Sequence, residues 1–241
     1  YCHYGSKTLL AEMYPGMKAW VDYQRKQEEA EGGLHLIKGG FHFADWLALD
    51  NKQPGPFGAT DPLYIASAYY FRCAKIVADA AEILGYEEAS EYKKLAEEIK
   101  KAICETYFDE SGACCSKTQT GAAIAIVFGL IEETAQEEGD RLHQRVAENN
   151  GHLNTGFVGT PLLCPALTKT GHHKTAVDLL LNEDYPSWLY SVNLGATTIW
   201  ERWNSVLPDG RMNPEGMNSL NHYSYGSIEA WMYGDVAGIR E

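Results

Sequence analysis

Apolar residues recur at three- and four-residue steps along most of the chain, which is the period of an α-helix with one buried face. The pattern is clearest between Pro62 and Gly85, at Leu63, Ala66, Tyr70, Cys73, Val77, Ala80 and Leu84. Asp61 is a favourable N-cap, a proline suits the first turn, and a glycine suits the left-handed residue after a helix end. The pattern therefore predicts a helix that begins at Pro62 and ends at Gly85.

The segment from 87 to 106 repeats this period with charged residues on its outer face, so the two segments form a predicted helical hairpin. Similar patterns predict further helices over 6–29, 120–130, 133–149, 157–168, 172–181, 196–204 and 223–237. No strand pattern of comparable strength interrupts these roughly nine helices. Three aromatic-rich connections, 39–46, 51–61 and 184–195, are expected to be ordered loops that share one functional face.

Serial helical hairpins predict an all-α fold, an (α/α)6 toroid whose inner helices surround a central funnel. A complete six-hairpin barrel needs twelve helices, so we expect this one to be incomplete, with the N-terminal hairpins missing. An incomplete toroid leaves apolar inner faces uncovered, which favours association. No composition shift marks a second domain, so residues 1–241 are interpreted as one partial barrel domain.

Composition narrows the class of ligand. The 241 residues are 45% hydrophobic, with a net charge of -13 and a pI near 5.0, which argues against nucleic acid and against an anionic membrane surface. No run approaches the roughly 18 apolar residues that span a bilayer. A neutral small molecule such as a sugar fits better. The chain opens at Tyr1 without a recognisable signal peptide, and export stays open because a preceding signal would lie outside this sequence.

The cysteines and histidines show no ligand spacing. Six irregularly placed cysteines do not form a disulfide scaffold, and the adjacent pair Cys114-Cys115 lacks the two-residue gap of a redox or zinc motif. The neighbours His172 and His173 are interpreted as helix-start or surface residues. We expect no metal, no organic cofactor and a reducing compartment, with the cytoplasm favoured.

The candidate chemistry centres on Glu201, which lies between Trp200 and Trp203 in the stretch Gly195-Ala-Thr-Thr-Ile-Trp-Glu-Arg-Trp203. A single carboxylate among aromatic rings is typical of a sugar-cleaving site. The alternative is a glutamate on an amphipathic helix whose tryptophans face the core.

Glycoside hydrolysis commonly uses two carboxyl groups, one to protonate the leaving oxygen and one to activate water. Glu201 is the candidate for the second role. For the first role the chain offers Asp45, which precedes Trp46 in a loop. Asp45 is equally well interpreted as a helix cap or as a ligand of a sugar hydroxyl.

Six segments resemble, in order and spacing, the catalytic domain of bacterial α-L-rhamnosidases of glycoside hydrolase family 78. The resemblance covers nearly the whole chain. Its most specific part is the run from Gly195 to Trp203, and the other segments are Asp45-Trp-Leu-Ala48, Thr118-Gln-Thr-Gly121, Asn154 to Thr160, Asp184 to Trp188 and Asn218 to Gly226.

The resemblance implies a six-hairpin α/α barrel that removes terminal α-L-rhamnose with inversion and without an organic cofactor. It implies that Glu201 is the general base, that Trp46 is an aromatic wall of the rhamnose pocket, and that His222 donates to a sugar hydroxyl. A core histidine packed by its tyrosine neighbours is the alternative for His222. Asp45, Trp200 and Trp203 complete the predicted substrate-binding set.

The chain departs from the family pattern in two ways. Ala44 stands where the family usually has glycine, which affects the loop if a positive φ is required there. The general acid of the family lies upstream of the first helix, and no counterpart is present, so Asp45 is not assigned as the acid. We therefore expect a piece of a larger enzyme that packs against accessory β-domains of its own chain.

Two other interpretations stay open. Unsaturated glucuronyl hydrolases and disaccharide phosphorylases share the toroid, but they should place Arg or Lys beside the catalytic carboxylate, and only Arg202 and Arg211 lie near Glu201 in sequence. A helical carbohydrate-binding module would keep the pocket without catalysis.

Overall fold

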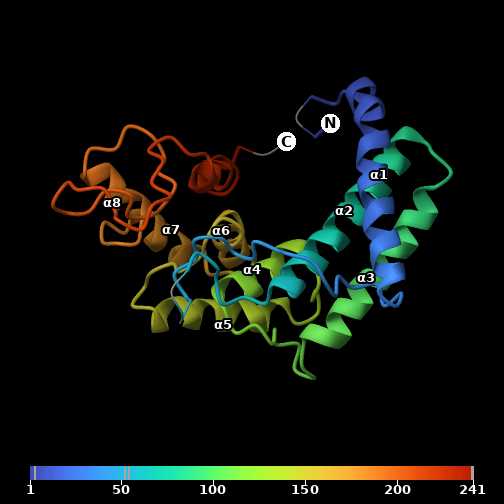
Figure 1. Ribbon diagram of the computed structural model, residues 1–241, viewed down its shortest axis with the longest axis horizontal. Coiled ribbons are helices and arrows are strands. Elements are labelled where there is room, and N and C mark those ends of the chain that lie inside the picture. Colours follow the sequence, from blue (N-terminus) through green and yellow to red (C-terminus); the bar gives the residue numbers. More distant parts are fainter. Residues whose placement is uncertain (3, 52, 54, 240–241) are drawn as a thin grey trace. The chain divides into compact units, whose positions relative to one another are not determined.

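The computed structural model describes residues 1–2, 4–51, 53 and 55–239 (Figure 1). Within these residues the chain is helical, and its β structure is limited to two isolated bridges, Trp46 with Phe57 and Val206 with Met212. The chain divides into two compact units. The first comprises Tyr1–His42 and Asp61–Glu110, and the second comprises Phe43–Thr60 and the chain from Ser111 onward.

The first unit contains three helices, α1 (Lys7–Ala30), α2 (Pro62–Leu84) and α3 (Ala89–Tyr107). Helix α2 packs against both of the others, and its buried face carries Tyr64, Phe71, Ala74 and Val77. The side chain of Asp61 accepts from the amides of Leu63 and Tyr64, and Gly85 ends the helix at φ 75°. The predicted caps of this helix are therefore confirmed.

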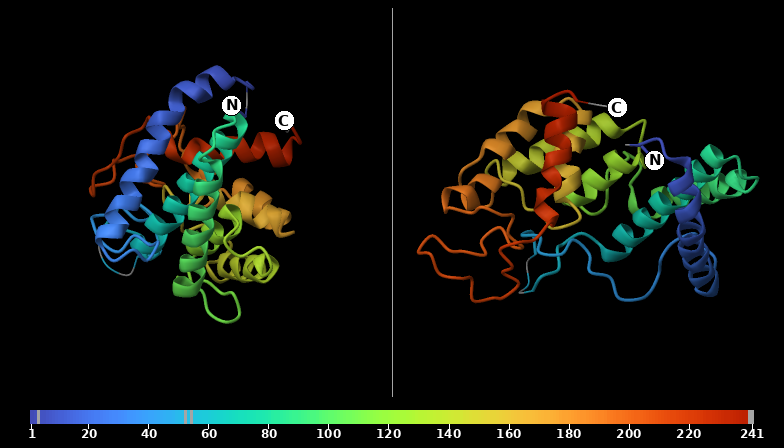
Figure 2. Two further views of the ribbon diagram at one scale, coloured as in Figure 1. Left: turned by 90° about the vertical axis from the view of Figure 1, so that its right-hand side faces the viewer. Right: turned by 90° about the horizontal axis from the view of Figure 1, so that it is seen from above.

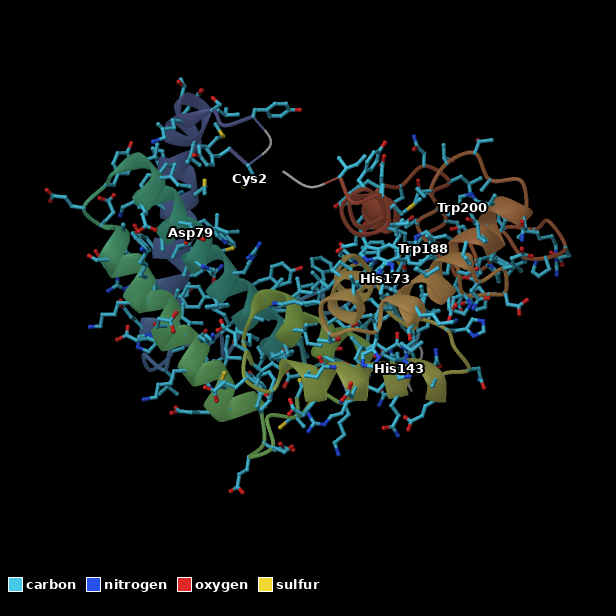
Figure 3. All side chains as sticks on the ribbon, turned by 180° about the vertical axis from the view of Figure 1, so that it is seen from behind. Cys2, Asp79, His143, His173, Trp188 and Trp200 are labelled. Atoms are coloured by element: carbon cyan, nitrogen blue, oxygen red, sulfur yellow. The ribbon has the colours of Figure 1, made fainter. Side chains whose placement is uncertain are left out.

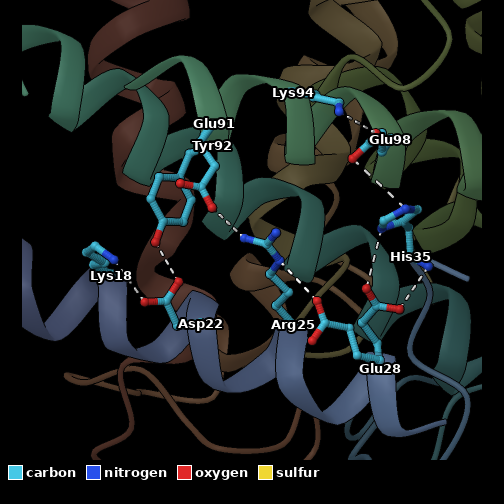
Figure 4. A network of polar contacts seen from close by, with 10 residues as sticks. Lys18, Asp22, Arg25, Glu28, His35, Glu91, Tyr92, Lys94 and Glu98 are labelled. Carbon is cyan, nitrogen blue, oxygen red and sulfur yellow. Dashed lines mark hydrogen bonds and ion pairs between the residues drawn. The ribbon is translucent and has the colours of Figure 1, made fainter. Parts of the chain in front are cut away.

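Charged residues tie α1 to α3 (Figure 4). The Tyr92 hydroxyl donates to Asp22, which also pairs with Lys18. Arg25 bridges Glu91 of α3, at 2.6 Å, and Glu29 of α1. Most of these groups are partly exposed, so we attribute orientation of the two helices to them and most of the stability to the apolar core.

The second unit begins with five α-helices: α4 (Gln119–Phe128), α5 (Ala135–Glu148), α6 (Thr160–Lys169), α7 (His173–Leu181) and α8 (Trp188–Asn193). A continuous helical stretch follows, made of the 3-10 helix η1 (Ser224–Ser227), α9 (Ile228–Trp231) and the π-helix η2 (Met232–Val236). Helix α6 contacts α4, α7 and α9, and Figure 2 shows the last helical stretch lying across this group.

Inner and outer helices alternate in this unit. Every residue of α4 except Val127 is buried, whereas α5 buries only Glu138, Gly139, Leu142 and Val146. Leu163 and Leu167 of α6 are also fully buried. This alternation of buried and amphipathic helices is the arrangement expected of helical hairpins around one core.

Two predictions about local structure are wrong. Residues 196–204 form an irregular segment rather than a helix, and residues 188–193 form α8 rather than a loop. The β-branched run Thr197-Thr198-Ile199 is a weak helix former. Its backbone pairs instead with a distant segment, because the His222 amide donates to Ile199 O at 2.8 Å and the Glu201 amide donates to Ser219 O at 2.9 Å.

Candidate active site

Glu201 lies on this irregular segment of the second unit. Its side chain is partly exposed, and its Oε2 accepts from the Ser219 amide at 3.0 Å. Within the part of the chain that the structure describes, Ser219 is the one hydrogen-bond donor to this carboxylate. The backbone pairing and this bond hold Glu201 against the segment 218–222 while the residue stays partly exposed. A carboxylate held in this way is able to take a proton from a water molecule.

The two arginines near Glu201 in sequence are engaged elsewhere. The Arg202 guanidinium pairs with Glu215 at 2.8 Å and donates to Gly216 O. Arg211 pairs with Asp209 at 2.7 Å. Each positive charge is thus matched by a neighbouring carboxylate, and neither guanidinium contacts Glu201 among the described contacts.

Trp203 belongs to the core. It is 5% exposed, it stacks on Tyr225 with ring centroids 3.9 Å apart, and its Nε1 donates to Thr155 O at 3.2 Å. Its ring also meets the edge of Trp188. Trp203 is thus packed within the core of this unit, an environment that does not support the predicted contact between Trp203 and substrate.

Trp200 is also buried, at 6% exposure. It borders a small void together with Trp188 and Trp203, and Figure 3 shows Trp188 and Trp200 in the same part of the unit. Its ring therefore supports the segment that carries Glu201 and does not present a face to a sugar. The tryptophans face the core, as one alternative expected, but they do so from a loop.

His222 lies next to the Glu201 segment through its amide bond to Ile199 O. Its imidazole stacks between Phe157, at 5.0 Å, and Tyr223, at 5.2 Å. The Ser224 amide donates to Nδ1 at 3.3 Å. In the neutral imidazole the proton then resides on Nε2, which makes Nε2 a donor suited to a hydroxyl oxygen.

Phe157 is a site residue that sequence reasoning did not single out. Its ring contacts both His222 and Tyr225, and its amide donates to Trp46 O at 2.9 Å. The segment Asn154 to Thr160 belongs to the family pattern, but no residue type within it signals chemistry. A search for polar side chains does not find Phe157, because this residue contributes an aromatic ring surface to the site.

Trp46 is partly exposed on the loop 43–60. Its ring meets the edges of Phe43, at 5.3 Å, and Phe57, at 5.1 Å, in nearly perpendicular arrangements. Phe43 is 62% exposed. Because its carbonyl accepts from Phe157, Trp46 is linked directly to the ring that stacks on His222.

Asp45 lies beneath this loop and is fully buried. Its Oδ1 accepts from the amides of Val158, at 2.7 Å, and Gly159, at 3.1 Å. Its Oδ2 accepts from the Gly156 amide at 2.9 Å and from the Thr120 hydroxyl at 2.5 Å. Burial raises the pKa of the Asp45 carboxyl, and these four donated hydrogen bonds oppose that rise.

The carboxyl group of Asp45 therefore holds two loops together and is not open to a ligand. Asp45 thereby sets the position of Trp46 and Phe157, and this environment does not support the predicted contact between Asp45 and substrate. The residue before it, Ala44, has a φ of 54°. The loop therefore requires a positive φ at the position where the family usually has glycine, and Ala44 adopts it.

An open cleft of about 500 Å³ adjoins His222. It is lined by Thr198, Ile199, Asn221, His222, Tyr223, Gly226 and Glu229. Among the described residues no cluster of three or more His, Cys, Asp or Glu side chains has the geometry to hold a metal ion. The described helices include none that is both long and apolar enough to cross a membrane.

Known proteins are similar to this chain in both sequence and architecture. The model of the bacterial alpha-L-rhamnosidase 6 hairpin glycosidase domain matches residues 1–236. An alpha-L-rhamnosidase of Formosa agariphila is 39% identical over 99% of this chain and 26% of its own length. One of Streptomyces avermitilis is 36% identical over 99% of this chain and 22% of its own length.

The solved structures agree. The Streptomyces avermitilis alpha-L-rhamnosidase complexed with L-rhamnose superposes with a TM-score of 0.88, covering 100% of this chain and 22% of that one. The native Aspergillus terreus enzyme, 33% identical, gives a TM-score of 0.86 over 97% of this chain and 27% of its own. The present chain thus spans about a quarter of the length of these relatives. The predicted all-α class is confirmed, and the chain belongs to the family of bacterial α-L-rhamnosidase six-hairpin glycosidase domains.

Proposed function

We propose that the protein carrying this chain hydrolyses terminal α-L-rhamnose from rhamnosides or rhamnose-containing polysaccharides, with inversion at the anomeric carbon. The observation that carries the proposal is the environment of Glu201. Its carboxylate is partly exposed and held by a single backbone donor, next to the stack of Phe157 and His222. Family membership supports rhamnose as the sugar that is released, and this geometry supports Glu201 as the base.

In the proposed reaction Glu201 accepts a proton from a water molecule as that water attacks the anomeric carbon. The C–O bond to the leaving group breaks with inversion, and a general acid protonates the leaving oxygen. Nε2 of His222 orients the rhamnose by donating to one hydroxyl. The aromatic face of Trp46 packs against the ring and stabilises the positive charge that develops on it.

We place the general acid outside these 241 residues. Asp45, the acidic residue of the Trp46 loop, is buried and already accepts four hydrogen bonds. The relatives are about four times as long as the matched region, which leaves room for the acid and for accessory β-domains that pack against this domain. The six irregularly spaced cysteines support a reducing compartment, which we propose is the cytoplasm.

The proposal is tested by incubating the full-length protein with p-nitrophenyl α-L-rhamnoside and following the anomeric configuration of the released rhamnose by proton NMR. The proposal expects β-rhamnose as the first-formed anomer. Release of the α anomer first would contradict inversion. A rate that requires added phosphate would indicate a phosphorylase, and rhamnose binding without release would indicate a binding module.

A further inference from the structure

The loop 204–217 interrupts the segment of Glu201 and returns the chain to Ser219, whose backbone pairs with Glu201. It belongs to the long irregular stretch between α8 and η1 (Figure 2). The outer part of the loop closes on itself, because Val206 forms an antiparallel bridge with Met212. The proposed hydrolysis gives this loop no role.

At its start the loop is tied to the residue that follows Glu201. Ser205 is fully buried, and its Oγ accepts from the Arg202 amide at 3.1 Å. The carbonyl of Ser205 accepts from the amide of Asn213, also a buried residue, at 2.9 Å. Hydrogen bonds between buried groups are stronger than those in water, so this part of the loop has a fixed geometry.

Asn218 continues the same set of hydrogen bonds just after the loop. Its Nδ2 donates to Asn213 O at 2.5 Å, and the next residue, Ser219, donates its amide to Oε2 of Glu201 at 3.0 Å. The group that faces Asn218 is a carbonyl, which can only accept, so the side chain must present its nitrogen here. These bonds form a closed circuit that begins and ends at the segment of Glu201.

The turn that leads into Ser219 is not one that the chain adopts freely. Gly216 and Met217 both have a positive φ, of 77° and 53°, and a non-glycine residue in this region is strained. The Oδ1 of Asn218 is buried and has no hydrogen-bond partner among the described residues, which also costs free energy. A strained turn persists only where surrounding contacts hold it, and the bond from Asn218 to Asn213 is such a contact.

We propose that Asn218 is a positioning residue for Glu201, and that it acts by holding the Ser219 amide on the carboxylate. The inference rests on the proposed rhamnosidase function, because it requires Glu201 as the base. It gives the loop 204–217 a role, which is to fix the direction in which the carboxylate meets the attacking water. This direction matters because a displacement of about 1 Å can lower a rate by about a hundredfold.

The first test is Asn218→Ala in the full-length protein, which removes the donor to Asn213. We expect kcat on p-nitrophenyl α-L-rhamnoside to fall by about ten- to hundredfold. KM should stay within about twofold, because Trp46 and His222 keep their own contacts. Asn218→Asp keeps the shape of the side chain without the N–H donor, and kcat should fall by a similar factor.

The matched control is Asn204→Ala. Asn204 is an asparagine of the same loop and is likewise partly exposed, and its side chain makes none of the hydrogen bonds of the circuit. We expect this variant to keep the kcat of the wild type. An equal fall of kcat in Asn204→Ala and Asn218→Ala would overturn the inference, because any truncation in the loop would then have the same effect.

Azide distinguishes positioning of Glu201 from a general effect on the fold. In Glu201→Ala, added azide attacks the sugar without needing a base, so its rate does not depend on where a carboxylate points. We therefore expect Glu201→Ala/Asn218→Ala to have the same azide-dependent kcat as Glu201→Ala, within about twofold. A further tenfold loss in the double variant would overturn the inference, because Asn218 would then act on the site as a whole.

Failure of this inference and failure of the proposed function give different results. A wild-type kcat in Asn218→Ala, together with an inactive Glu201→Ala, would overturn the positioning role and leave the rhamnosidase function intact. A wild-type protein that releases no rhamnose would overturn the proposed function, and the positioning role with it.

Discussion

Asp45 and Glu201 are acidic residues on two irregular segments of the same unit, and each has an aromatic neighbour in sequence. Asp45 is fully buried and accepts four hydrogen bonds, whereas Glu201 is partly exposed and accepts one. All four donors to Asp45 come from residues 120 and 156–159, far along the chain. The first carboxylate is a structural tie, and the second keeps the freedom that proton transfer needs.

The contrast teaches that proximity to aromatic residues does not distinguish a catalytic carboxylate from a structural one. The number of donors does. A carboxylate whose lone pairs are all occupied has no position left for a ligand, and its loss should lower the stability of the fold. A carboxylate with free lone pairs should appear in turnover.

The strongest test of this contrast is Glu201→Gln in the full-length protein. The amide keeps the shape of the side chain and loses the base, so kcat on p-nitrophenyl α-L-rhamnoside should fall by about 10²–10⁴-fold. KM should stay within about threefold, because ground-state contacts remain. In Glu201→Ala, added azide should restore turnover and give β-rhamnosyl azide, since azide attacks without losing a proton.

Glu215→Gln is the control for that experiment, because Glu215 pairs with Arg202 on the exposed side of the same segment. Loss of this pair should change stability by less than about 1 kcal/mol. If Glu201→Gln had the same kcat as Glu215→Gln, Glu201 would not be the base. The contrast with Asp45 would then have no bearing on catalysis.

The next largest effect is expected for Asp45→Asn. The new side-chain NH2 group would face N–H and O–H groups that donate to the carboxylate in the native protein. At least one buried backbone amide would then lose its hydrogen-bond acceptor. We expect the free energy of unfolding to fall by about 2–3 kcal/mol, measured by urea denaturation. KM should rise as well, because Trp46 and Phe157 lose their common support.

Asp50→Asn is the matched control, five residues along the same loop. Asp50 is partly exposed and accepts from the Ala59 amide at 2.8 Å, and an amide oxygen can accept that bond equally well. We expect a loss below about 1 kcal/mol. Equal losses in the two variants would show that the donors around Asp45 do not require a carboxylate.

The two carboxylates also mark what the sequence could predict. The helix that begins at Pro62 carries its own signals in Asp61 and Gly85, and both act locally as expected. The pattern of residues 196–204 predicts a helix that the structure does not contain, because the backbone partners of this segment lie about twenty residues away, in 219–222. Local propensity carries no information about such pairing.

The site shows the same division. Glu201 and His222 are candidates on the sequence alone because their segments are distinctive, and backbone pairing brings these two segments together in the structure. Neither the burial of Asp45 nor that of Trp203 could be predicted, because each depends on residues from other elements, such as Gly156 and Thr155. Residue type suggested which side chains could take part in the proposed chemistry, and only packing distinguished exposed groups from buried ones.

The smallest expected effect concerns Ala44, which precedes Asp45 and adopts a φ of 54°. A non-glycine residue in this region is strained, and glycine relieves the strain while adding entropy to the unfolded chain. We expect Ala44→Gly to raise the free energy of unfolding by about 0.5 kcal/mol. Ala48→Gly, a buried site without a positive φ, should lower it by about 0.5–1 kcal/mol. Opposite signs in one urea series would show that the fold holds the Asp45 loop against local strain, whereas losses in both variants would contradict that conclusion.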